Sequence, residues 1–138
     1  MTNEELIQEA KKAREQAYAP YSHFKVGAAL MTKSGKIYHG CNIENAAYSP
    51  TNCAERTAFF KAVYEGEREL EKIAIVGGTD GQEPDDTCAP CGVCRQVMME
   101  FCDPYTFQVI LADGKDRQLV LTLGQLLPYG FGPGNLKK

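Results

Sequence analysis

FKVGAALMT, residues 24–32, is followed by the short segment KSG, residues 33–35, and then by KIYHGCNI, residues 36–43. The first of these segments is an apolar run containing Val and Leu, which favours a strand. A connection of three residues that includes Gly is typical of a tight turn between antiparallel strands. This stretch therefore predicts a β-hairpin, which would form an antiparallel edge of a larger sheet.

Helices and strands are predicted on both sides of this hairpin. An amphipathic helix is expected over residues 3–17, because Leu6 and three alanines recur there at helical spacing. Thr2 or Asn3 would cap this helix. The segments expected after the hairpin are a helix over 53–65, a strand over 72–79, a helix over 91–102, strands over 107–112 and 117–121, a short helix over 122–127 and an irregular tail over 128–138.

The order of these segments indicates the fold class. A strand, a helix and a second strand in succession form a right-handed parallel crossover, whereas the hairpin is antiparallel. Together they predict a single α/β domain over residues 1–138, with a mixed five-stranded sheet that combines an antiparallel hairpin with parallel crossovers. Helices would cover both faces of this sheet, in a three-layer α/β/α arrangement.

Composition and charge narrow the function classes. The chain has 138 residues, of which 43% are hydrophobic and 24% charged, and a net charge of −3, the balance of a soluble globular domain. A nucleic-acid surface needs a basic stripe, and none is present, so a small-molecule ligand is favoured over a polymer. The sequence shows neither a secretory signal nor a membrane span, so we expect a cytoplasmic protein that does not bind membranes and whose thiols stay reduced.

Three cysteines and one glutamate form the candidate site. Cys53 opens one predicted helix, with Glu55 two residues later, and Cys91 and Cys94 lie at the start of another. Unpaired N–H groups and the dipole at a helix N-terminus favour the thiolate, which is the form that binds zinc. Three protein ligands leave the fourth position of a tetrahedral zinc ion to water, the arrangement of a catalytic site.

Cys88 leaves an alternative open. It forms a second Cys-x-x-Cys pair with Cys91, and as a fourth ligand it would close the site into a structural one. It precedes the predicted helix that carries the other two cysteines, which argues against this alternative. Cys41 and Cys102 are expected to be packed thiols.

With these residues identified, the chain resembles the small homotetrameric cytidine deaminases. The resemblance is carried by FKVGAAL at 24–30, GCNIENA at 40–46, CAERTA at 53–58 and PCGVCRQ at 90–96. Two of these segments contain the zinc-deaminase signature, Cys-x-Glu followed by Pro-Cys-x-x-Cys, in which the Glu is general acid and base.

The resemblance implies a role for each candidate residue. Cys53, Cys91 and Cys94 would bind one Zn²⁺ per subunit, and Glu55 would shuttle protons. The pyrimidine nucleoside would be held by Asn42 and Glu44 at the ribose 3′-hydroxyl, by Phe24 against the base, by the Ala54 backbone at the polar edge of the base, and by Tyr48 and Phe131 from neighbouring subunits of a homotetramer.

Charge assigns a further role to Arg56. Three thiolates around Zn²⁺ leave a net charge of −1, which makes a bound water harder to ionise than at a neutral site. A cation beside the sulfurs would offset this charge, and the resemblance implies that Arg56 is that cation. Arg95 is a second, weaker candidate.

The function implied is zinc-dependent hydrolytic deamination of cytidine and deoxycytidine to uridine and deoxyuridine, with release of ammonia, in pyrimidine salvage. A deaminase of cytosine-nucleoside antibiotics, of the blasticidin type, is one alternative, although Asn42 and Glu44 suit the ribose of a free nucleoside. A non-enzymatic structural zinc module is another, and it would need a closed site or a basic face.

Overall fold

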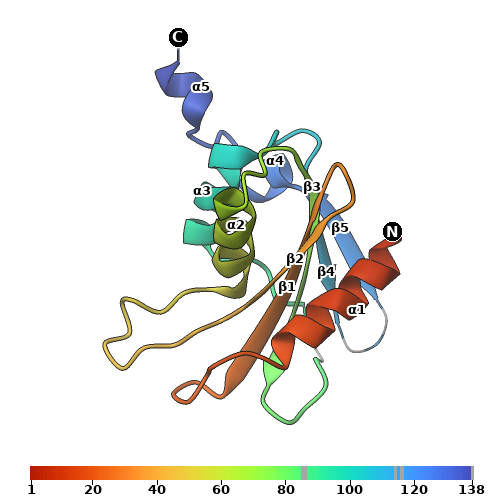
Figure 1. Ribbon diagram of the computed structural model, residues 1–138, viewed down its shortest axis with the longest axis vertical. Coiled ribbons are helices and arrows are strands. Elements are labelled where there is room, and N and C mark those ends of the chain that lie inside the picture. The colour runs from red at the N-terminus through yellow and green to blue at the C-terminus, as the bar shows by residue number, and fades with distance from the viewer. Residues whose placement is uncertain (85–86, 114, 116, 138) are drawn as a thin grey trace.

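The structure, a computed structural model, describes residues 1–84, 87–113, 115 and 117–137. Its centre is a five-stranded sheet with the strand order β2-β1-β3-β4-β5 (Figure 1). The strands are β1 (Phe24–Thr32), β2 (Ile37–Cys41), β3 (Leu70–Thr79), β4 (Gln108–Ala112) and β5 (Gln118–Thr122). The helices are α1 (Asn3–Arg14), α2 (Ala54–Tyr64), α3 (Gly92–Phe101), α4 (Leu123–Leu126) and α5 (Pro133–Leu136).

The strand pairing confirms the predicted mixed sheet. β1 pairs antiparallel with β2 on one side and with β3 on the other, so β2 and β3 run in the same direction with β1 between them. β3 pairs parallel with β4, and β4 pairs antiparallel with β5. The connections through α2 and α3 therefore each join two parallel strands, and only the second joins hydrogen-bonded neighbours.

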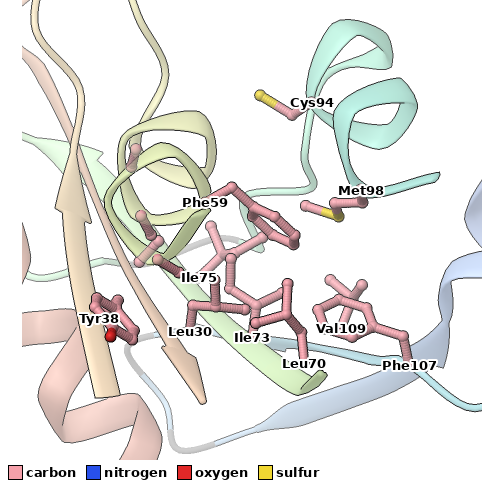
Figure 2. Packing of buried hydrophobic residues seen from close by; sticks show 14 of the residues in the cluster. Leu30, Tyr38, Phe59, Leu70, Ile73, Ile75, Cys94, Met98, Phe107 and Val109 are labelled. Carbon is pink, nitrogen blue, oxygen red and sulfur yellow. The ribbon is translucent and has the colours of Figure 1, made fainter. Parts of the chain in front are cut away.

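Helices cover both faces of the sheet, as predicted (Figure 1). α1 packs on one face, where Leu6, Ile7 and Ala10 contact alternate strand residues such as Ala29 and Ala74. α2 and α3 pack on the other face, and Figure 2 shows Phe59 lying between Met98 and the strand residues Ile73 and Ile75. β3 is buried over most of its length because both of its faces are covered.

Two glycines on paired strands let α1 and α2 approach the sheet closely from opposite sides. A Cβ on Gly27 would lie 2.1 Å from the carbonyl oxygen of Ala10 in α1, and a Cβ on Gly40 would lie 2.2 Å from that of Ala54 in α2. Neither distance is tolerable for a real side chain. Gly40 therefore determines where the N-terminus of α2 rests, and that N-terminus carries the candidate site.

The first helix ends earlier than predicted. The helix expected over 3–17 ends at Arg14, because the next residues form a turn that leads Tyr18 into a bridge with Ile43. At its start Thr2 is the cap, in a capping box with Glu5.

The expectation of an irregular tail is wrong at Pro133–Leu136, which form α5. Proline suits the first position of a helix, because its fixed φ is helical and its missing N–H would lack a partner there. Residue 138 of the expected tail lies outside the described residues. None of the described helices has the length and apolar character that crossing a membrane requires.

Candidate metal centre

The N-termini of α2 and α3 bring three cysteines together. Cys53 is the N-cap of α2, Cys91 is the N-cap of α3, and Cys94 lies in the first turn of α3. Neither N-cap side chain makes a capping hydrogen bond, so both sulfurs are free for other partners. Both helix dipoles favour negative charge at this point.

The sulfur positions fit a zinc ion. Sγ of Cys91 lies 3.8 Å from Sγ of Cys53 and 3.4 Å from Sγ of Cys94, and the three sulfurs lie within 4.8 Å of one another. A tetrahedral zinc ion with Zn–S bonds of about 2.3 Å would place its sulfur ligands about 3.8 Å apart. In the part of the chain that the structure describes, no fourth His, Cys, Asp or Glu joins this group. A fourth coordination position is therefore left without a protein ligand.

Cys88 lies beside this centre without belonging to the group. Its Sγ would lie 2.8 Å from a Cβ placed on Gly77, and the ring of Phe24 approaches the same point. Burial raises the pKa of the Cys88 thiol to about 11, which favours a protonated, packed thiol. Because Cys88 is not among the sulfurs that lie within 4.8 Å of one another, the alternative in which it closes the site is not supported.

The pKa values of the Cys53 and Cys94 thiols are linked. The neighbouring Cys94 thiol, assisted by Arg56, lowers the pKa of Cys53 to about 5 against the effect of burial. The charge on Cys53 in turn raises the pKa of Cys94. Three thiolates at this spacing therefore need a cation, and a soft all-sulfur donor set suits zinc.

Glu55 is the carboxyl group of the centre. It follows Cys53 by two residues in the first turn of α2, and only 4% of its surface is exposed. In the thiol site without metal, burial raises the pKa of Glu55 to about 7, with a smaller contribution from the charge on Cys53. A group with a pKa near the working pH can both accept and donate a proton.

Arg56 contacts one of the three sulfurs. Its Nη2 donates to Sγ of Cys53 over 3.4 Å, and this contact raises the pKa of the guanidinium. Its Nε is buried without a hydrogen-bond partner among the described residues. Arg95, the second candidate, instead donates to the carbonyl oxygens of Pro90 and Leu126, so it holds the segment that enters α3.

The Asn42 side chain bonds to the first residues of β1, and the Glu44 side chain bonds to the segment just before that strand. The Asn42 side chain accepts from the N–H of Val26 and donates to the carbonyl oxygen of Phe24, over 2.8 and 2.9 Å. The Glu44 carboxylate accepts from the N–H groups of Tyr21 and Ser22 and from the Ser22 hydroxyl. These bonds, with that from the Ser22 hydroxyl first, hold the pKa of Glu44 below 4.5.

Phe24 and Ala54 lie at the starts of β1 and α2. Phe24 is 41% exposed, and its ring lies over Gly77 and near Cys88. Ala54 is fully buried as the first residue of α2, directly after Cys53. Both positions are compatible with the base contacts that the resemblance implies.

Tyr48 and Phe131 are exposed in the single chain. Tyr48 has a left-handed φ of 62° and makes an edge contact with Tyr21 at a ring distance of 6.1 Å. Phe131 is 57% exposed, and its carbonyl oxygen accepts from the Gln96 side chain of α3. Their expected roles in a neighbouring subunit's site stay predictions.

Ser22 is a site neighbour that the sequence did not reveal. It contacts Glu44 through both its N–H and its hydroxyl. A serine in a polar loop has many available partners, and only the fold of residues 19–23 against residue 44 selects this one. In the sequence, only its position two residues before Phe24, a predicted base contact, placed Ser22 near the site.

Comparisons with known proteins agree with this geometry. Residues 1–110 match the family described as the cytidine and deoxycytidylate deaminase zinc-binding region. A cytidine deaminase of Sporosarcina psychrophila is 54% identical over 99% of this chain and 96% of its own length, and one of Halalkalibacterium halodurans is 50% identical over 95% of each. The crystal structure of cytidine deaminase from Burkholderia pseudomallei is 53% identical and superposes with a TM-score of 0.86, covering 95% of this chain and 100% of that one. With its zinc-compatible thiol centre and buried carboxyl, the chain belongs to the cytidine and deoxycytidylate deaminase zinc-binding family.

Proposed function

We propose that the protein hydrolyses cytidine and deoxycytidine to uridine and deoxyuridine and releases ammonia. The observation that carries this proposal is the open three-sulfur centre with the buried carboxyl of Glu55 on the same helix turn. A structural zinc module would need a fourth protein ligand and would have no use for a buried carboxyl. Family membership supports an enzyme that acts on a pyrimidine nucleoside.

The chain's own residues divide the work. Cys53, Cys91 and Cys94 would hold one Zn²⁺, which lowers the pKa of a bound water toward ~7. Glu55 would accept a proton from that water as its oxygen adds to C4, hand this proton to N3 of the cytosine ring, and carry the second proton of the same water to the amine that leaves C4 as ammonia. Burial raises the pKa of Glu55 to about 7, so its protonated and ionised forms lie close in free energy near neutral pH. This suits a group that acts first as base and then as acid.

Nucleoside recognition would come from the β1 and β2 ends beside the centre. Asn42 and Glu44 would bind the ribose 3′-hydroxyl, Phe24 would pack against the base, and the Ala54 backbone would contact its polar edge. Glu44 lines a surface hollow with Tyr21, Ser22, Tyr48 and Thr51, which supports a ligand contact at this point.

Tyr48 and Phe131 would complete the site of a neighbouring subunit. Their exposure in the single chain supports this role, because aromatic side chains gain most when a partner covers them. The assembly would be a homotetramer acting in pyrimidine salvage in the cytoplasm. Sedimentation of the wild type and of Phe131→Ala, together with activity, tests the assembly separately from the chemistry.

A substrate panel tests the function. Ammonia release is measured with cytidine, deoxycytidine, adenosine and blasticidin S, with and without a zinc chelator. We expect turnover of the first two substrates and its loss with chelator. Turnover of blasticidin S alone would assign the antibiotic-type activity instead, and an inactive zinc-loaded protein would contradict an enzymatic role.

A further inference from the structure

Tyr21 and Ser22, just before β1, bind the carboxylate of Glu44. Oε1 of Glu44 accepts from the N–H of Tyr21 at 3.0 Å and from that of Ser22 at 3.1 Å. Oε2 accepts from the Ser22 hydroxyl. Three donors from two consecutive residues thus fix a side chain 22 positions later in the chain.

The number of acceptor positions shows which oxygen stays available to a ligand. A carboxylate offers about four lone-pair positions, two on each oxygen. The two N–H groups occupy both positions on Oε1, and the Ser22 hydroxyl occupies one on Oε2. The single remaining position is on Oε2, so a ligand hydroxyl and the Ser22 hydroxyl would share this oxygen.

Ser22 also connects Glu44 to the start of β1. Its Oγ accepts from the N–H of Phe24 at 3.0 Å, so one hydroxyl joins the expected ribose contact to the expected base contact. The intervening residue, His23, has a left-handed φ of 57°, which costs energy for a residue with a side chain. The N–H of Asp80 donates to the His23 carbonyl oxygen at 2.7 Å and helps to hold this conformation.

The backbone of Glu44 is fixed as well. Its N–H donates to the carbonyl oxygen of Tyr18 at 2.9 Å, and the preceding residue, Ile43, exchanges backbone hydrogen bonds with Asn52. The remaining freedom of Glu44 therefore lies in its side-chain torsions, where the two N–H groups restrain Oε1 and the Ser22 hydroxyl restrains Oε2.

We propose that Ser22 is a positioning residue for nucleoside binding, which orients Oε2 of Glu44 toward the ribose 3′-hydroxyl. This inference rests on the proposed function, because it needs a nucleoside whose ribose is read by Glu44. Ser22 acts through Glu44, and its effect falls on the binding of substrates that carry a 3′-hydroxyl.

The experiment compares cytidine with 3′-deoxycytidine, which lacks that hydroxyl. In Ser22→Ala the KM for cytidine should rise about tenfold, the effect expected for losing a hydrogen bond to a charged group. The kcat for cytidine and the KM for 3′-deoxycytidine should stay near their wild-type values. Ser22→Thr, which keeps a hydroxyl, should restore most of the loss for cytidine.

A matched control removes a serine hydroxyl elsewhere. Ser34 lies in the turn between β1 and β2, where its hydroxyl bonds that of Thr32 at 2.9 Å, and Ser34→Ala should change neither KM. An equal rise in KM for both substrates in Ser22→Ala, or no rise for cytidine, would overturn the role of Ser22. A wild type that releases no ammonia from cytidine would instead overturn the proposed function itself.

Discussion

Nη2 of Arg56 donates to Sγ of Cys53 across the first turn of α2, over 3.4 Å. The guanidinium therefore lies against the sulfur that carries negative charge most readily in this cluster. A cation at this position would offset part of the net charge of −1 that three thiolates would leave on a zinc ion. The spacing of the two residues in the first turn of α2 brings the guanidinium to the sulfur.

Removing this cation should slow the chemical step. In Arg56→Ala we expect kcat for cytidine to fall about tenfold, as for the loss of one charge-assisted hydrogen bond, with little change in nucleoside affinity. Steady-state kinetics at equal zinc content measure this. Arg56→Lys keeps the charge but not the planar guanidinium, so its kcat should lie between those of the wild type and Arg56→Ala. An unchanged kcat in Arg56→Ala would refute the charge argument.

Replacing the carboxyl of Glu55 should separate binding from chemistry. Glu55→Gln keeps the shape of the side chain but cannot carry a proton, so kcat should fall by about 10²–10⁴-fold, while zinc content and uridine binding persist. Metal analysis and calorimetry with uridine check both points. Glu65→Gln, at the exposed C-terminal end of the same helix, serves as the control, and near-normal turnover of Glu55→Gln would contradict the mechanism.

Cobalt substitution should count the sulfur ligands. Co²⁺ in the centre should give thiolate charge-transfer absorption of three sulfurs, because Cys53, Cys91 and Cys94 form the group and Cys88 does not. Cys88→Ser should leave this absorption unchanged, whereas Cys94→Ser should weaken it. A weaker band in Cys88→Ser would show that this thiol binds the metal.

Nucleoside binding should resist moderate acid. The Ser22 and Tyr21 donors hold the pKa of Glu44 below 4.5, so the carboxylate stays ionised as the pH falls from neutral, and binding weakens only when the pH passes that lowered value. We therefore expect a constant inhibition constant for uridine down to about pH 5. In Ser22→Ala the weakening should begin at a higher pH, and Glu44→Gln should show no such transition. Weakening of wild-type binding that begins near pH 6 and is absent from Glu44→Gln would contradict this account.

Gly40 should be intolerant of a side chain. A Cβ would lie 2.2 Å from the Ala54 carbonyl oxygen and 2.6 Å from the Ala58 nitrogen, so Gly40→Ala must displace α2 or β2. We expect a loss of about 1–3 kcal/mol in the free energy of unfolding, measured by urea denaturation. Gly134→Ala, where a Cβ meets nothing within 4 Å, should cost far less, and equal losses in the two variants would contradict the close approach.

The sequence predicted the sheet and the metal cluster well because both follow from local chemistry. The bounds of β1 are those expected from its apolar run, and Cys53 and Cys91 cap the helices that they were expected to open. The extent of α1 and the helical turn at Pro133–Leu136 depend on neighbouring segments, and the sequence missed them.

Hydrogen bonds between residues far apart in the sequence could not be predicted from local patterns either. Arg14 is a buried cation that donates to the carbonyl oxygens of Lys25, Gly78, Thr79 and Gln82. A charged residue at a helix end is normally read as exposed, and only the meeting of α1 with the β1 and β3 ends gives it these acceptors. The Ser22 contact with Glu44 has the same cause.

A metal ion bound at this centre would also affect the stability of the fold. Cys53 follows the hairpin, whereas Cys91 follows β3, and their positions differ by 38 residues. An ion bound to both would act as a crosslink, and closing a loop of this length removes unfolded-chain entropy worth about 4 kcal/mol when the link survives unfolding. The ion that serves the chemistry would thus also join the start of α2 to the start of α3.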